Sequence, residues 1–441
     1  MIAQKQPSYW LFLHPYVYVS IKKAKAILYN TLNGTLLEFD ETKKEILKLI
    51  EKLNSDTHLY VVKIRKEEIN HNLARFIEKL RETYSGDIID TSSRPHKPFQ
   101  PKPFLNLHRT LDYLTEGGEK NKIPVNDQVK DYLNVLTLYL NGDCEQTCPM
   151  CQTAFKQFPC CRKTCHQGAK AQRNTKGFTI RNEIDHEDIR RLLAETKDNS
   201  LKRLNIIGGN IFRYSHLIPL VKELNSLAIT RVYHLHYLNL RDNPEFFKEF
   251  RAGAEKNRLN VTVHFPLNRD AFNSAFIRLQ NEKLPVVKFA FVIESIEDMT
   301  RAEEIIAAHN IRDFEFCPYY NGGNLAFFKD NVFINKDALV ESKPGMNDIL
   351  ARQLINSQEF KKLTVLNSKE IFANPNNPRI GKLGQDNIYD LIFRELHKGK
   401  SWTKTRKNVT PCKSCVYNAL CPPISGYEYA LRRYNLCTIN E

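Results

Sequence analysis

Apolar and polar positions alternate in two different patterns on either side of a proline-rich stretch. Residues 8–90 begin with strand-like apolar runs, and Asn33-Gly34 among them is a hairpin signal. Two later segments carry apolar residues at helical spacing, namely Ile46, Leu47, Ile50 and Leu53, then Ile69, Leu73, Phe76 and Leu80. Residues 1–90 are therefore predicted to form a small α+β unit with two amphipathic helices.

The next part of the chain, residues 91–130, lacks this patterning. It contains the stretch TSSRPHKPFQPKPF, with four prolines, and then a polar stretch that includes EGGEKNK. We interpret it as a linker whose proline-rich half is extended and semi-rigid.

From Val135 onward, short β-rich runs alternate with amphipathic helical stretches. The six β-rich runs are residues 135–140, 203–207, 231–238, 260–265, 286–293 and 314–320. This alternation predicts an α/β fold over residues 131–345, with a parallel sheet rolled into a partial (β/α)6 barrel. A site in such a fold is expected at the C-terminal ends of the strands. Residues 346–400 are interpreted as a connecting segment, and residues 401–441 as a short cysteine-rich domain.

Composition narrows the class of protein. The chain has 441 residues, of which 42% are hydrophobic, so a globular protein of several domains is expected. No apolar run approaches the ~18 residues of a membrane span, and the N-terminus lacks the pattern of a signal peptide. We therefore expect a cytoplasmic protein without membrane contact. Its 11 cysteines should be reduced there, which favours metal ligation for clustered ones.

The net charge of +15 has two interpretations. One is a solvated lysine-rich surface, and the other is an acidic partner, either RNA or an acidic peptide. Charge alone does not decide between them.

Three cysteines follow the first predicted strand of the α/β region. Cys144, Cys148 and Cys151 have the spacing C-x3-C-x2-C, at the strand end where a site is expected. Thiolates bind soft metals and iron–sulfur clusters in particular. Three thiolates, in place of the four of a closed cluster, would leave one iron open, as a catalytic metal requires.

This motif, placed directly after the first of six β/α repeats, resembles the signature of the radical SAM enzymes over residues 132–320. The resemblance implies that Cys144, Cys148 and Cys151 are catalytic and hold a [4Fe–4S] cluster whose open iron binds S-adenosylmethionine (SAM). Reductive cleavage of SAM would then yield a radical that abstracts a hydrogen atom from the substrate.

A turn after the second predicted strand matches a second feature of the family. Relatives carry a Gly-Gly-Glu-Pro-like turn that contacts the methionyl amino group of SAM, and this chain has Gly208-Gly209-Asn210 there. The resemblance implies that these three residues bind the cofactor. Asn210 replaces the usual acid and carries no charge.

A second cysteine pattern closes the chain. Cys412, Cys415 and Cys421 have the spacing C-x2-C-x5-C, and Cys437 follows. A zinc knuckle is one interpretation. The pattern also resembles the SPASM extension of radical SAM peptide maturases, which implies one auxiliary [4Fe–4S] cluster on these four residues. Ser425 stands where that family has a cysteine for a different auxiliary cluster.

Four cysteines remain outside both patterns, namely Cys160, Cys161, Cys165 and Cys317. They would either bind a second auxiliary cluster or be free buried thiols. The sequence leaves both alternatives open. His234 and His236, which alternate on one predicted strand, similarly either line the barrel or are packed as ordinary core histidines.

Residues 8–90 resemble the winged-helix-like PqqD-type module that binds a leader peptide as an added edge strand, and the C-terminal segment is similar to maturases and pseudo-radical-SAM proteins of Bacteroidales-type peptide systems. The resemblance implies a maturase that installs a thioether or C–C crosslink in a ribosomal precursor peptide. It also implies a low-potential electron donor and, as a further partner, another peptide-modifying enzyme. The alternatives are a catalytically weakened scaffold, which presents a peptide to a partner maturase, and a radical SAM enzyme acting on RNA.

Overall fold

The fold is described from a computed structural model. It describes residues 7–103, 130–164, 182–196, 200–240, 243–284 and 286–439. The polar half of the predicted linker and Cys165 lie outside these residues.

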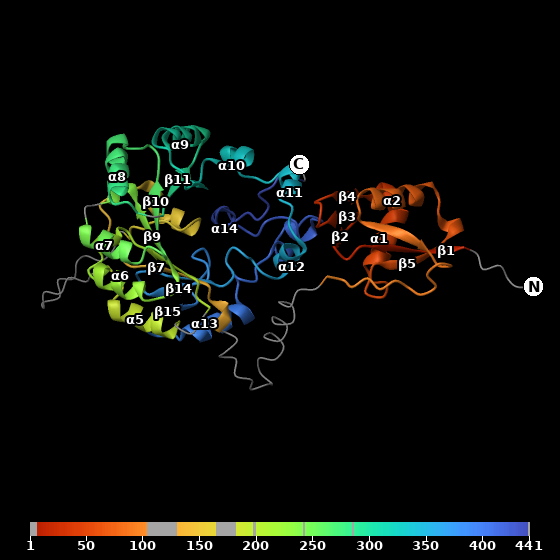
Figure 1. The fold of residues 1–441 in the computed structure, drawn as a ribbon, viewed down its shortest axis with the longest axis horizontal. Coiled ribbons are helices and arrows are strands. Elements are labelled where there is room, and N and C mark those ends of the chain that lie inside the picture. Colours follow the sequence, from red (N-terminus) through yellow and green to blue (C-terminus); the bar gives the residue numbers. More distant parts are fainter. Residues whose placement is uncertain are drawn as a thin grey trace, which may run out of the picture.

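The N-terminal region folds into two small antiparallel sheets and two helices (Figure 1). In the first sheet, β1 (Ser8–Leu13) lies between β5 (Val61–Arg65) and β6 (Gly86–Asp90). The second sheet is a meander of β2 (Val17–Lys22), β3 (Lys25–Asn30) and β4 (Leu36–Phe39). Both predicted helices are confirmed as α1 (Lys44–Asn54) and α2 (His71–Glu82), and each buries its apolar stripe.

Two turns shape the meander, and only one was predicted. Gly34 has φ +80° in the loop between β3 and β4, as the Asn33-Gly34 signal indicates. The tighter turn joins β2 to β3, where Lys22 pairs with Lys25 and Lys23 has φ +53°. The sequence KKAK contains none of the residues that usually adopt this conformation, so the turn gave no signal.

The six predicted β-rich runs form one parallel sheet in chain order. These strands are β7 (Val135–Tyr139), β8 (Arg203–Ile207), β9 (Thr230–His236), β10 (Asn257–Val263), β11 (Val287–Ile293) and β12 (Phe314–Pro318). The predicted helices between them are α5 (His186–Glu195), α6 (Leu217–Asn225), α7 (Pro244–Ala252), α8 (Arg269–Asn281) and α9 (Ile296–His309). The predicted mixed α/β fold with a parallel sheet is confirmed.

The strands have one apolar face and one polar face. Leu136, Leu138, Leu204 and Ile206 pack with helical side chains in the main hydrophobic core. The alternate positions, such as Thr137, Asn205 and His234, line an inner cavity on the other face. This polarity is unlike a close-packed barrel centre, and the cavity that it leaves is lined mostly by the N-terminal halves of β8, β9, β10 and β11.

Residues 346–400 do more than connect two domains. β13 (Lys362–Val365) joins the sheet parallel to β7, and β14 (Glu370–Phe372) and β15 (Gly381–Lys382) extend it antiparallel. The remaining helices of the described C-terminal part are α10 (Leu325–Asn331), α11 (Lys336–Glu341), α12 (Met346–Leu354), α13 (Ile388–Lys398) and α14 (Gly426–Leu431). The described helices include none that is long and apolar enough to cross a bilayer.

The N-terminal region packs on the C-terminal segment, with β2, β3 and β4 beside α11 and α12 in Figure 1. Ile27 and Tyr29 of β3 share a buried apolar cluster with Leu339, Val416 and Leu420. An ion pair of 2.6 Å between Lys336 and Glu38 borders this contact. The two ends of the chain are thus brought together.

Candidate metal centres

The first cysteine motif lies at the C-terminal edge of the parallel sheet, as predicted. Its loop follows β7, and Cys148 caps a short 3-10 helix, Pro149–Gln152. The thiol of Cys148 lies beside that of Cys151, and this contact lowers the pKa of Cys151. Cys144 accepts a hydrogen bond from Asn239 Nδ2 at 3.4 Å. The three soft donors therefore gather on one loop, a donor set that suits an iron–sulfur cluster.

The two glycines of the predicted cofactor turn allow close backbone approach to this loop. A Cβ atom added to Gly209 would lie 2.4 Å from the carbonyl oxygen of Asp143, and one added to Gly208 would lie 2.7 Å from Asn141 Oδ1. Any larger residue would push the turn away from the segment that leads into Cys144.

Asn210, the third residue of this turn, is buried with only half of its amide paired. Its Oδ1 atom accepts a hydrogen bond from the Phe212 backbone N–H at 3.1 Å. Its Nδ2 atom is buried and has no partner among the described residues. The side chain therefore has an unused donor at the position where the resembling family has an acid.

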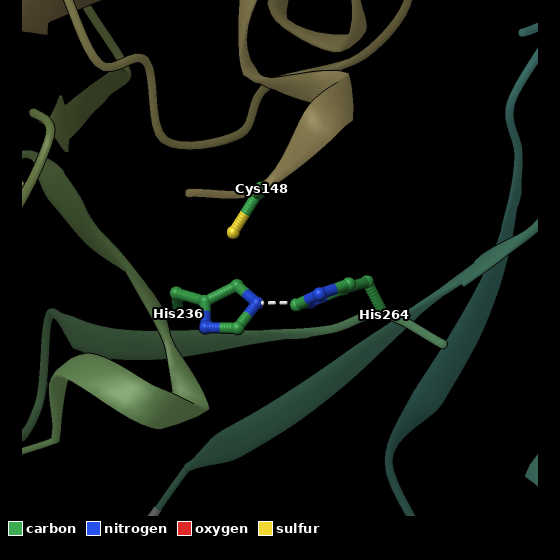
Figure 2. A group of neighbouring side chains, drawn as sticks. All are labelled: Cys148, His236 and His264. Carbon is green, nitrogen blue, oxygen red and sulfur yellow. Dashed lines mark hydrogen bonds between the residues drawn. The ribbon is translucent and has the colours of Figure 1, made fainter. Parts of the chain in front are cut away.

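Two histidines, His236 and His264, lie beside Cys148 (Figure 2). Of the two, only His236 was considered from the sequence. Ligand atoms of Cys148, His236 and His264 all lie within 4.8 Å of one another. Burial lowers the pKa of His236 to about 3, and burial also lowers the pKa of His264. His264 directly follows β10 as His236 ends β9, so the strand pattern held the signal that could have found it.

The inner cavity has a volume of about 900 Å³ and extends along the sheet to Tyr139, Phe158 and Cys317. His234 lines it, is 5% exposed, and has no hydrogen-bond partner for either ring nitrogen among the described residues. Burial lowers the pKa of His234 to about 3, so the ring is neutral. Asn260 also lines the cavity with an unpartnered Oδ1 atom. The lining therefore offers unused polar groups.

Residues 160–164 form a strap across the first cysteine loop. Arg162 N–H donates to the Gly208 carbonyl at 3.1 Å, and Thr164 N–H donates to the Gly142 carbonyl at 3.1 Å. This strap brings the buried thiol of Cys161 into a hydrogen bond with Cys151. Cys160 is buried as well, and burial raises its pKa. With Cys165 outside the described residues, the second auxiliary cluster stays a prediction.

The four C-terminal cysteines line one cavity, which we call the four-cysteine cavity. Its volume is about 560 Å³, and its lining includes Cys412, Cys415, Cys421 and Cys437. Burial raises the pKa of Cys421 to about 12. Four convergent thiols around an open space fit a cluster with four cysteine ligands. Ser425 is not part of this lining and instead caps α14.

A buried ion pair borders this cavity through Arg406, which is part of the lining. Arg406 donates to both carboxylate oxygens of Glu428, at 2.9 and 3.0 Å. The two side chains are 7% and 1% exposed. Arg406 also contacts Cys412 Sγ at 3.8 Å, so the pair connects α14 to a proposed ligand.

Comparisons with known proteins find solved structures of low sequence identity to this chain. No protein-family model and no curated protein sequence matches the chain. Two solved structures of SuiB from Streptococcus suis match 98% of this chain and 99% of their own at 14% identity. One is bound to the precursor peptide SuiA (TM-score 0.46) and the other to S-adenosylmethionine (TM-score 0.44).

A third solved structure, methylornithine synthase (PylB), matches a smaller part of the chain. The match covers 65% of this chain and 87% of that protein, at 11% identity and a TM-score of 0.32.

Proposed function

We propose that this protein is a radical SAM peptide maturase. It abstracts a hydrogen atom from a precursor peptide and installs a thioether or C–C crosslink. The observation that carries the proposal is the gathering of Cys144, Cys148 and Cys151 at the C-terminal edge of the parallel sheet, against the Gly208-Gly209 turn. A second, four-cysteine cavity supports it, because an auxiliary cluster is expected in the peptide-modifying branch.

Each part of the site has a role in this proposal. Cys144, Cys148 and Cys151 would hold a [4Fe–4S] cluster and leave one iron for SAM. When bound, the two groups would supply reductive cleavage of the sulfonium, using one electron from a low-potential donor protein or reductant. Gly208 and Gly209 keep the backbone close to the ligand, and the unpartnered Nδ2 of Asn210 offers it a hydrogen bond. The strap from Cys160 to Thr164 fixes the start of the cysteine loop and the glycine turn through its backbone hydrogen bonds to Gly142 and Gly208.

The inner cavity is the proposed place for the reacting part of the peptide. Its lining includes Phe155 and Phe158, which follow the cysteine motif in the sequence, and the unpartnered polar atoms of His234 and Asn260. The N-terminal unit is proposed to hold the leader part of the same peptide as an added strand. The +15 charge suits an acidic leader.

Anaerobic reconstitution with iron and sulfide, followed by addition of SAM and dithionite, tests the proposal. We expect 5′-deoxyadenosine from the natural chain and none from Cys148→Ala. A chain that holds its clusters but does not cleave SAM would overturn the enzyme proposal, and the scaffold that presents a peptide to a partner maturase would replace it.

One observation favours a second candidate, a mononuclear zinc protein. Cys148, His236 and His264 offer one sulfur and two nitrogen ligands within 4.8 Å (Figure 2), which is a set that zinc accepts. Elemental analysis of the protein as purified decides between the two candidates. Zinc alone, lost in a His264→Ala variant, would support the second one. Iron with an equal amount of sulfide would exclude it.

A further inference from the structure

The four-cysteine cavity is walled partly by the opposite end of the chain. Lys22, Lys23 and Lys25, from the tight turn between β2 and β3, line it together with the cysteines. They are separated from Cys412 by most of the sequence, yet Figure 1 shows the β2–β4 sheet against the C-terminal segment. The N-terminal unit thus contributes residues to a metal site whose four thiols belong to another part of the chain.

This turn is held in place by a packed interface. Directly behind it, Ile27 and Tyr29 of β3 are buried against Val416 and Leu420, which lie between the cysteine ligands in the sequence. The ion pair between Glu38 and Lys336 anchors the same sheet at its other edge. The position of the lysines relative to the cysteines is therefore set by two independent contacts.

The charge around the cavity is strongly positive. The lining contains three lysines and Arg406 against a single acidic residue, Glu41. Glu428 neutralises Arg406 through two hydrogen bonds. In the described part of the chain, none of the three lysines forms an ion pair. Lys25 acts on the Asp40 carboxylate through its charge alone.

A cluster with four thiolate ligands is anionic, and each electron that it accepts adds negative charge. Nearby positive charge stabilises the reduced form more than the oxidised form. We propose that Lys22, Lys23 and Lys25 of the N-terminal unit belong to the auxiliary-cluster site and raise its reduction potential. The proposal rests on the auxiliary cluster of the proposed function but not on SAM cleavage.

The test isolates the auxiliary cluster in the full chain. In a Cys144→Ala/Cys148→Ala/Cys151→Ala background, the reconstituted cluster is titrated with dithionite, and the reduced form is followed by EPR. We expect the triple variant Lys22→Gln/Lys23→Gln/Lys25→Gln to have a more negative potential than the background. The difference should shrink at high salt, because Lys23 and Lys25 are exposed.

Two matched variants keep the result interpretable. Lys48→Gln/Lys52→Gln/Lys66→Gln removes the same charge from exposed positions of the same unit outside this cavity, and we expect a much smaller shift. Replacing Lys22, Lys23 and Lys25 by arginine keeps the charge, and we expect the background potential. Equal shifts in the two glutamine triples, or no shift in the first, would overturn the proposal. Absence of any cluster in the background would overturn it as well, whereas failure of SAM cleavage would not.

Discussion

The Nε2 atom of His236 lies 2.5 Å from the Nδ1 atom of His264, across the C-terminal ends of neighbouring strands β9 and β10. Leu238 N–H donates to Nδ1 of His236 at 3.2 Å, so the proton of the neutral ring is on Nε2. His236 therefore donates to His264, whose own proton is on its Nε2 atom. The pair forms a directed chain of neutral donors at the edge where Cys148 lies.

Replacing His264 should show how much the hydrogen bond between the two histidines contributes to stability. In His264→Ala the buried Nε2–H group of His236 has no partner, which typically costs about 1–3 kcal/mol. We expect a lower urea midpoint than in His71→Ala, a matched change of an exposed histidine. Iron bound after reconstitution should be unchanged. Loss of iron in His264→Ala would show that the histidine takes part in cluster binding.

Removing one member of the Arg406–Glu428 ion pair should lower the stability of the protein more than replacing both members together. Arg406→Gln leaves Glu428 buried without its cation, and breaking such a pair typically costs about 3–5 kcal/mol. Replacing both residues by methionine should recover part of that loss. Urea unfolding of the apo protein measures both variants. Equal stability of the single and the double variant would contradict the prediction.

The iron content of single variants should distinguish a cluster in the four-cysteine cavity from the cluster on Cys144, Cys148 and Cys151. We expect Cys421→Ala to lose about four irons per chain, the content of one cubane cluster, and to keep the cluster on Cys144, Cys148 and Cys151. Ser414→Ala changes a residue that also lines the cavity, and it should keep all the iron. Iron analysis and EPR of the reduced proteins check this. Full iron content in Cys421→Ala would contradict the proposed ligand set.

Stability should depend on pH through Glu359, which lines the inner cavity. Burial raises the pKa of Glu359 to about 7. Between the ordinary carboxyl pKa of about 4.3 and that value, the unfolded chain loses this proton while the folded chain keeps it. The folded state therefore loses stability as pH rises through this window, by about 3–4 kcal/mol in total.

Glu359→Gln should remove this contribution. We expect the variant to gain in Tm relative to the natural chain between pH 5 and pH 8. Glu255→Gln, at an exposed position, should follow the natural chain. If the Tm of the natural chain and the Tm of Glu359→Gln change with pH in the same way over this range, Glu359 is not desolvated in the folded protein.

Asn210→Asp should lower the stability of the ligand-free protein and raise its affinity for SAM. The aspartate can still accept the Phe212 N–H, but it replaces the unpartnered Nδ2 by a buried charged oxygen. We expect a lower Tm without ligand and a larger rise in Tm with SAM, whose ammonium group can pair with the carboxylate. An equal rise in both proteins would place Asn210 away from the ligand.

The sequence by itself determined the features that depend on local pattern. The six strands and the helices between them follow from apolar periodicity, because each must bury one face. The grouping of Cys144, Cys148 and Cys151 follows from spacing within one loop. α1 and α2 were predicted for the same reason, since Ile46, Ile50 and Leu53 meet on one side of a helix.

Only the tertiary structure decided the relationships between distant residues. His236 meets His264 because the register of β9 and β10 aligns their ends. Residues 346–400 were interpreted as a connecting segment, yet β13 pairs with β7 in the sheet. Only four residue pairs form this contact, and so short a strand leaves little pattern in the sequence. The lysines of the β2–β3 turn reach the four-cysteine cavity through the packing of Ile27 and Tyr29 on the C-terminal segment. Such contacts depend on the summed burial of both partners, which no local window of the sequence contains.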